Sequence, residues 1–188
     1  MSVRSALLAI LTIGPAYGLQ LHGELASRTA GRRSVNAGQI YGTLERLIRQ
    51  DAVESAGATP DGLPLYRLTR SGHEEALDWL HGTDSFPGDE WSDLVDRVLI
   101  ASSLPQVDAM KVVTAYREHW EAVGAGTAPS VSGQDRLAAQ AGQSLANAAL
   151  AWLDDVETQL VSDGQGALSR VFSADRPRRG RRPAVPVG

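Results

Sequence analysis

Hydrophobic positions recur with a helical period along most of the chain, in stretches separated by turns rich in glycine and proline. Residues 36–50 give the clearest case, because four apolar residues there predict one buried stripe: Ile40, Leu44, Leu47 and Ile48. The opposite face of this helix carries an amide, a glycine and two guanidinium groups: Gln39, Gly42, Arg46 and Arg49. Asn36 is a favourable N-cap for its start. Periodicity alone favours an ordinary amphipathic surface helix, and only the neighbouring segments change that interpretation.

The segments on either side predict a winged helix-turn-helix domain. Two helices precede this one, over residues 3–13 and 19–29, and the Gly14-Pro15 turn ends the first. After Gln50 the pattern becomes extended, with strands predicted at 52–55 and 65–69 around a turn-rich stretch at 57–64. A hairpin directly after the third helix is a wing. Thr69 or Ser71 then caps a fourth helix that reaches about His81.

The second half of the chain has helical periods and no convincing strand. Residues 81–89 contain two glycines and a proline, which indicates a domain boundary, and helices are predicted at 90–104, 105–123 and 134–161. The last of these is long and rich in alanine, which favours packing across a homodimer interface. We therefore expect a mainly α fold in three parts. These are a DNA-binding domain at 1–82, a helical dimerisation and effector domain at 88–163, and a disordered basic tail at 164–188.

Composition removes several classes of protein and of site. The chain has no cysteine, which excludes disulfides and zinc-thiolate sites and is typical of the cytoplasm. No apolar run is long enough to span a membrane, and the N-terminus lacks the form of a signal peptide. The four histidines are scattered, and the motifs HExxH, GxSxG and the phosphate-binding glycine loop are absent. We therefore expect neither an enzyme nor a bound metal or cofactor.

Charge is distributed unevenly along the chain. Residues 1–81 hold eight basic and eight acidic residues, residues 82–175 hold five and fourteen, and the last thirteen residues hold five arginines and no acid. Between Arg28 and Arg49 there are five arginines and a single acid, Glu45. Positive charge is thus concentrated around the 36–50 helix, where it would favour DNA phosphates. The basic tail is either a flexible phosphate contact or a solvated segment without a role.

Three segments resemble the PadR family of bacterial transcriptional regulators: IL…GPAYGL at 10–19, GQIYGTLERL at 38–47 and YRLTRSG at 66–72. The resemblance covers residues 1 to about 80, and beyond residue 90 it is limited to helical character. It implies a homodimer held by C-terminal helices, with each winged domain on one DNA half-site. Gly42 stands where the family has proline, which costs about 1 kcal/mol of helix propensity relative to alanine. The wing tip holds Asp61 and no Lys or Arg, which argues against a strong phosphate contact there.

The resemblance and the side-chain chemistry together suggest roles in reading double-stranded DNA. Asn36 and Gln39 suit adenine edges, and Arg46 suits a guanine edge or a phosphate. Phosphate contacts are expected from the remaining candidates: Arg33, Tyr41, Thr43, Arg49 and Arg67. Each is alternatively an ordinary surface residue, and Tyr41 is alternatively part of the core. The implied function is an operator-binding regulator, with repression as the family's usual mode. The alternative is a winged helix that docks on proteins without touching DNA.

Two tryptophans on the C-terminal helices raise the question of a small-molecule effector. Trp120 and Trp152 could line a pocket for a flat aromatic compound, although core and interface packing is the preferred interpretation. Four acidic residues in this half would favour a cationic effector, or else form a solvated face: Asp93, Asp96, Asp154 and Asp155.

Overall fold

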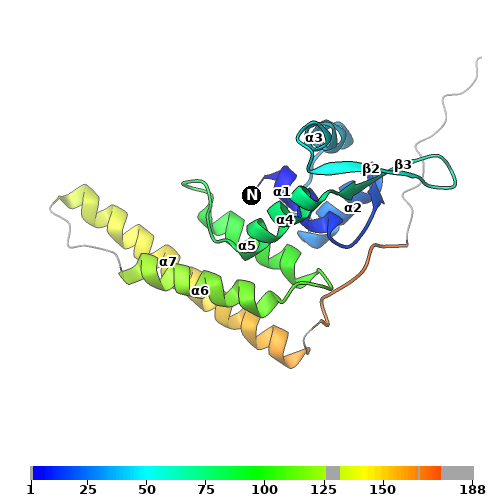
Figure 1. Cartoon of the computed structure of the whole chain (residues 1–188). Helices are drawn as coiled ribbons and strands as arrows, with labels where there is room; N and C mark the ends of the chain where they lie inside the picture. Colours follow the sequence, from blue (N-terminus) through cyan, green and yellow to red (C-terminus); the bar gives the residue numbers. More distant parts are fainter. Residues whose placement is uncertain (1, 126–131, 165, 175–188) are drawn as a thin grey trace, which may run out of the picture.

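The computed structural model describes residues 2–125, 132–164 and 166–174 of the 188-residue chain. Within these ranges the elements are α1 (Val3–Leu11), β1 (Ala16–Tyr17), α2 (Gly18–Arg28), α3 (Ala37–Arg49), β2 (Val53–Ala58), β3 (Pro64–Leu68), α4 (Arg70–His81), α5 (Glu90–Ser102), α6 (Ala109–Ala125) and α7 (Gly133–Ser162). Three helices, a hairpin and then further helices confirm the predicted mainly helical fold with an N-terminal winged helix-turn-helix (Figure 1).

Helix α1 lies at the centre of the N-terminal domain. Its residues 6–11, with the sequence ALLAIL, are all buried, and it contacts α2, α3, α4 and β3. A helix that is apolar around most of its circumference must be covered on several sides, which explains why the other elements surround it. Ser2 caps its start, since Oγ accepts a hydrogen bond from the backbone N–H of Ser5 at 3.1 Å.

The wing belongs to a three-stranded antiparallel sheet in the order β1-β3-β2. Strand β1 was not predicted from the sequence, because two residues are too few to show the alternation that identifies a strand. Strands β2 and β3 pair as far as Ala58 opposite Pro64, with an irregularity in the register before this pair. The wing turn therefore comprises residues 59–63 and is shorter than the predicted 57–64.

The start of α4 is fixed by a cap and by a close backbone contact. Of the two predicted caps, Thr69 is the one used, since its Oγ1 accepts from the N–H of Gly72 at 3.1 Å. A Cβ added to Gly72 would lie 1.8 Å from the carbonyl oxygen of Ala52. Only glycine permits this approach, so Gly72 sets how closely α4 packs on the segment that leads into the wing.

The predicted start of the helix after α5 was wrong. Helix α6 begins at Ala109 rather than at Pro105, because the residues after Leu104 form a turn in which Val107 N–H donates to the Leu104 carbonyl. Asp108 accepts a hydrogen bond from the N–H of Met110 at 3.1 Å, as a residue at a helix start does. This Asp is the start signal that the apolar period alone did not reveal.

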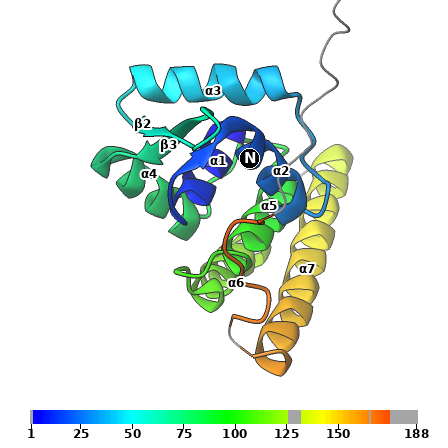
Figure 2. The ribbon, with the colours of Figure 1, turned by 90° about the vertical axis from the view of Figure 1, so that its right-hand side faces the viewer.

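Helices α6 and α7 pack along one another and extend away from the winged domain (Figures 1 and 2). The face of α7 toward this packing is buried and built from small and aliphatic side chains: Ala146, Ala149, Leu153 and Leu160. Arg117 of α6 links the two helices through ion pairs to Asp154 and Glu157, at 2.7 and 2.8 Å. The connecting residues 126–131 lie outside the described part of the chain.

Residues 166–174 fall within the tail that the sequence predicts to be disordered from residue 164 onward. We call this segment the C-terminal strap. It leaves the end of α7, returns to the N-terminal domain and runs against α2 (Figure 2). Its backbone atoms form hydrogen bonds with groups distant in sequence, on Glu24, Arg28 and Ser103, which no local pattern could have predicted. Residues 175–188 lie outside the described part of the chain.

Candidate DNA-binding surface

Helix α3 is held by its apolar side and capped at its N-terminus. Ile40, Leu44 and Leu47 are at most 1% exposed, whereas Ile48, which was predicted in the same stripe, is 43% exposed. Ile48 lies at the edge of the stripe, next to the side of the helix that faces away from the core. Asn36 is the N-cap, with Oδ1 accepting from the Gln39 N–H at 2.8 Å. The side-chain oxygen of Asn36 is thus engaged in the helix start.

The other side of α3 faces outward and is not covered by any described element. Figure 2 shows the helix lying across the top of the N-terminal domain. Gln39, Arg46 and Arg49 are exposed there. A Cβ added to Gly42 would meet nothing within 4 Å, so this face is also slim. An uncovered helix that presents an amide, two guanidinium groups and no bulky apolar side chain along its middle has the shape and chemistry to enter a DNA major groove.

Thr43 belongs to the interior of this arrangement and not to its outer face. It is 2% exposed, and its Oγ1 donates to the Gln39 carbonyl at 2.8 Å. The same oxygen accepts a hydrogen bond from Nη2 of Arg46 at 2.9 Å. Thr43 therefore orients the guanidinium of Arg46 from the buried side of the helix. Thr43 itself lies one helical turn after Gln39.

Tyr41 is half-buried between α3 and the start of α2. A Cβ added to Gly18 would lie 2.5 Å from Cε1 of Tyr41, so the ring covers the first residue of α2. The ring also packs against the hydrophobic core. Burial raises the pKa of the nearby Tyr66 hydroxyl, and Tyr41 and Glu45 raise it further. Of the two interpretations from sequence, this placement matches a partly buried core residue with its edge at the surface.

Arg33 is ion-paired within the protein. Its Nε donates to Oδ2 of Asp96 at 2.5 Å, and the neighbouring Arg32 donates to Oδ1 of the same carboxylate at 2.9 Å. Asp96 lies on α5 and is fully buried, whereas the two arginine side chains are 32% and 39% exposed. One buried carboxylate thus pairs with two of the arginines that precede α3, and its single negative charge offsets one of their two positive charges. Asp96 was not singled out as their partner from the sequence, because 63 residues separate it from Arg33.

Arg67 on the wing is also paired with an acid. Its Nε donates to Oε1 of Glu54 on the adjacent strand at 2.7 Å, and both side chains are about half exposed. At the wing tip Asp61 accepts a hydrogen bond from the Thr59 hydroxyl at 2.7 Å, which closes the turn internally. The wing therefore presents a neutralised arginine and an acid where a phosphate contact would need free positive charge.

Residues 7–78 match the model of the transcriptional regulator PadR-like family. We call this matched region the PadR-like domain. No curated protein sequence matches the chain significantly. Among solved structures, it is similar to Bacillus subtilis PadR in complex with operator DNA, with 20% identity over 81% of this chain and 96% of that one and a TM-score of 0.41. It is also similar to Bacillus subtilis PadR in complex with p-coumaric acid, with 20% identity over 85% and 98% and a TM-score of 0.39. A third similar structure is smu.1604c from Streptococcus mutans UA159, with 17% identity over 84% and 99% and a TM-score of 0.39.

The two tryptophans considered for an effector do not meet in one pocket beside the PadR-like domain. Trp120 is 2% exposed and lines a cavity of about 480 Å³ between the 83–90 segment and helices α6 and α7. Trp152 is not among the residues that line this cavity, and its ring instead packs edge-on against Trp91 with centroids 5.8 Å apart. The cavity wall includes two acids and a histidine: Asp84, Glu90 and His119.

The acidic residues of the C-terminal half do not form one solvated face. Asp93 and Asp96 are buried, while Asp154 is exposed and pairs with Arg117. Next to Asp93, the guanidinium of Arg97 is buried over the rings of Trp79 and Tyr116, at 4.9 and 5.5 Å from their centroids. Arg97 also donates to the carbonyls of Gly82 and Asp84. Burial lowers the pKa of Arg97 and raises the pKa of Tyr116 to about 12. This buried polar cluster joins the PadR-like domain to the helices after it.

Two kinds of feature are absent from the described residues. No helix in this part of the chain is both long and apolar enough to cross a membrane. Residues 2–125, 132–164 and 166–174 also contain no group of three or more His, Asp or Glu side chains placed to hold a metal ion.

Proposed function

We propose that this protein is a transcriptional repressor that binds an inverted-repeat operator as a homodimer. The observation that carries the proposal is the uncovered outer face of α3, with Gln39, Arg46 and Arg49 exposed on a capped and well-packed helix. The match of residues 7–78 to the PadR-like family of transcriptional regulators supports a regulator. Repression, dimerisation and control by an effector are our extensions.

The packing of each side chain suggests how the face would read DNA. Gln39 would pair with an adenine edge, and Arg46 with a guanine edge or a phosphate, held in orientation by Thr43. Arg49 would contact a phosphate, as would the exposed amide nitrogen of Asn36. Thr43 is too buried to be proposed as a phosphate contact, and Arg33 and Arg67 would first have to leave their carboxylates.

DNA binding is tested with the upstream region of the protein's own gene and the purified full chain. Wild type should protect an inverted repeat, and its affinity should fall steeply with salt. Gln39→Ala and Arg46→Ala should each weaken binding at the repeat by about 1–3 kcal/mol. Lys111→Ala, which removes one positive charge from an exposed position on α6, is the matched control and should bind like wild type. Wild type that binds no DNA, with or without effector, would refute the proposal.

The homodimer is supported by an uncovered apolar stripe on α7. Helical spacing places four residues on one side of α7, away from the face that packs on α6: Leu137, Ala141, Leu145 and Ala148. Leu137 is 68% exposed and Leu145 is 37% exposed, although both are large and apolar. Light scattering should give the mass of two chains for wild type. Leu137→Glu should shift the mass toward one chain, whereas Val171→Glu, a similarly exposed position outside α7, should not.

We propose that an effector binds the cavity lined by Trp120. Asp84 and Glu90 in its wall favour a positively charged compound, and the indole supplies a surface for an aromatic cation. The probe is phenyltrimethylammonium, with benzoate as the anionic control of similar size. Only the cation should quench tryptophan fluorescence and release DNA, and Glu90→Gln should weaken both effects together. Release by benzoate alone would refute the charge preference.

A further inference from the structure

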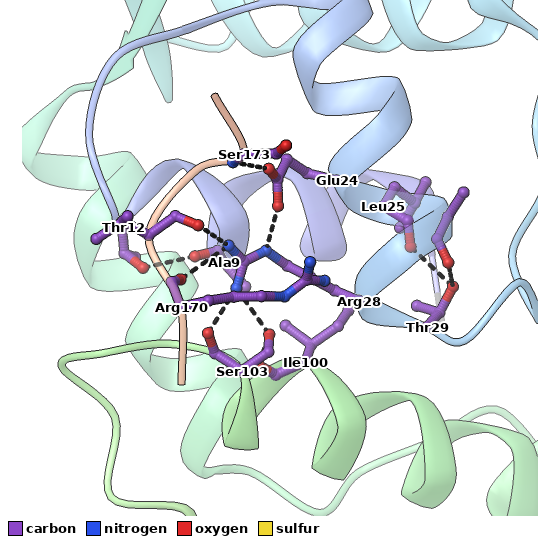
Figure 3. Close-up of polar contacts among 12 residues, drawn as sticks. Ala9, Thr12, Glu24, Leu25, Arg28, Thr29, Ile100, Ser103, Arg170 and Ser173 are labelled. Carbon is purple, nitrogen blue, oxygen red and sulfur yellow. Dashed lines mark hydrogen bonds and ion pairs between the residues drawn. The ribbon is translucent and has the colours of Figure 1, made fainter. Parts of the chain in front are cut away.

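The C-terminal strap is bonded to the PadR-like domain through its backbone. Nη2 of Arg28 donates to the carbonyl oxygens of Arg170 and Val171, at 2.9 and 3.2 Å (Figure 3). The N–H of Ser173 donates to Oε1 of Glu24 at 2.7 Å. Both partners lie on α2, the helix that precedes α3 in the helix-turn-helix. The strap therefore attaches the chain that leaves the end of α7 to the DNA-reading unit.

Every N–H of the Arg28 guanidinium is hydrogen-bonded. Nε donates to Oε2 of Glu24 at 2.8 Å, and Nη1 donates to the carbonyl and the hydroxyl of Ser103, the C-cap of α5, at 2.5 and 2.9 Å. The two bonds from Nη2 go to the strap, and together these bonds use the whole donor set of a guanidinium. Arg28 and Glu24 are each 3% exposed. A buried ion pair is tolerated only when its other polar groups are satisfied, so this pair holds α2, α5 and the strap in one arrangement.

The strap adds a second connection between α7 and the PadR-like domain. One connection runs through α6, which packs on α7 and on α4. The strap leaves the end of α7 and returns to α2, so the two connections meet the domain on different helices (Figures 1 and 2). Near α7, Leu168 and Ser169 of the strap line one cavity of about 290 Å³ together with Leu160 of α7. A domain held on two helices cannot pivot about either one, so the strap limits how far α3 moves relative to α7.

The position of α3 relative to α7 matters in the proposed homodimer, where α7 forms the interface and α3 reads the DNA. One extra base pair between two half-sites displaces a half-site by about 3.4 Å along the duplex and rotates it by about 34–36°. The strap bonds to α2 are 2.7–3.2 Å long. Since a donor and an acceptor about 3.6 Å apart no longer form a hydrogen bond, a shift of that size between α2 and the strap would break all of these bonds.

We infer that Arg28 and Glu24 are positioning residues that, by holding the strap, make the protein select operators by the spacing of their half-sites. The strap fixes α3 relative to α7 in each protomer, and hence the separation of the two α3 helices in a dimer. The inference rests on the proposed function, because spacing matters only to a dimer that binds an inverted repeat. It adds a selectivity that base contacts from α3 do not supply, since those contacts depend on the sequence of each half-site alone.

The first test compares operators that differ only in the number of base pairs between the half-sites. Fluorescence anisotropy gives the affinity of the full chain for the native operator and for versions with one base pair inserted or removed. Wild type should bind the altered operators at least about ten-fold more weakly, which corresponds to the loss of one hydrogen bond to a charged group. Equal binding of wild type to all spacings would overturn the inference.

A pair of variants at Ser173 then separates the strap from the rest of the fold. Ser173→Pro removes the N–H that Glu24 accepts, while Ser173→Ala keeps the N–H and is the matched control. We expect Ser173→Pro to reduce the spacing penalty at least about three-fold and Ser173→Ala to keep it. Discrimination against base changes within a half-site should stay at the wild-type value in both, which a general loss of structure would not give. An unchanged spacing penalty in Ser173→Pro would overturn the inference.

The second test measures the positioning without DNA. Because the chain has no cysteine, His73→Cys at an exposed position on α4 provides one spin-label site per protomer. Double electron–electron resonance gives the distances between the two labels of a dimer. Ser173→Pro should broaden this distribution by at least about 3.4 Å, the length of one base-pair step, relative to Ser173→Ala. Arg28→Lys keeps the charge beside Glu24 but lacks the fork that reaches the strap, and it should broaden the distribution as well.

The outcomes of this second test distinguish the two proposals. Equally narrow distance distributions in Ser173→Pro and Ser173→Ala would overturn the inference, even if operator binding is normal. If wild type gives no distance between labels because it is a single chain, or binds no operator at any spacing, the proposed function fails.

Discussion

Asp96 offers a substitution that should move stability and DNA affinity in opposite directions. It is fully buried and accepts hydrogen bonds from Arg32 and Arg33, at 2.9 and 2.5 Å. Asp96→Asn removes the charge and leaves a side chain of nearly the same shape. Both arginines then face an amide that cannot neutralise them, and they become free to turn toward solvent or DNA.

The expected decrease in stability follows from these interactions. Hydrogen bonds that involve charged groups contribute about 1.5–3 kcal/mol each, which sets an upper range of about 3–6 kcal/mol for the two. The decrease is smaller than this range because both arginines are about one-third exposed and can be hydrated, and because asparagine has no buried charge to desolvate. We therefore expect Asp96→Asn to lower the free energy of unfolding by about 2 kcal/mol, measured by urea denaturation.

DNA affinity should respond in the other direction. Each freed arginine that reaches a phosphate steepens the salt dependence of binding by about 0.9 in the log–log slope, so affinity at low salt should rise. Asp154→Asn is the matched control, because it also breaks a pair with an arginine but at a side chain that is 65% exposed on α7. Asp154→Asn should lower the free energy of unfolding by less than about 1 kcal/mol and leave the salt dependence of DNA binding unchanged. A destabilised Asp96→Asn protein with the wild-type salt slope would refute the idea that Asp96 withholds positive charge from DNA.

Three further substitutions test packing, ionisation and the support of α3. Gly72→Ala should lower the free energy of unfolding, measured by urea denaturation, by at least about 3 kcal/mol, because its Cβ would lie 1.8 Å from a backbone oxygen. Gly42→Ala should instead raise the free energy of unfolding by about 1 kcal/mol. Equal effects of the two substitutions would contradict the packing argument. Burial raises the pKa of Tyr116 from 10.0 to about 12, so the folded state holds the phenol proton more tightly than the unfolded state. Between pH 10 and 12, wild type should therefore lose about 2–3 kcal/mol of unfolding free energy relative to Tyr116→Phe. Parallel pH profiles of stability for the two proteins would disprove this. Thr43→Val should leave the fold intact but weaken operator binding several-fold, because Arg46 loses its acceptor; unchanged affinity would remove Thr43 from the set of residues that support DNA binding.

The N-terminal half of the fold could be predicted well because its signals are local. The cap at Asn36, the buried stripe of α3 and the cap at Thr69 depend on residues within a few positions of one another. The same reasoning failed where a signal was too short or was overlooked. Strand β1 has only two residues, and the start of α6 depends on Asp108 rather than on Pro105.

The candidate DNA-binding residues show the same division. The exposure of Gln39, Arg46 and Arg49 follows from helical geometry once the apolar side of α3 is known. The hydrogen-bond and ion-pair partners of the other candidates could not be predicted from helical geometry. Thr43 is turned inward, and Arg67 is paired across the wing, because neighbouring side chains satisfy them better than solvent does.

The sequence by itself determined the order of helices and strands, the face of α3 that points outward and the uneven distribution of charge. Each of these depends on the identity of residues close together in the chain. Only the tertiary structure decided which charges remain free. Asp96 meets Arg33 across 63 positions, and Arg28 meets the strap across 142 and 143 positions, because folding brings buried charges to the partners that offset their desolvation. The sequence therefore predicted a basic tail from residue 164, and only the fold placed residues 166–174 of that tail against the PadR-like domain.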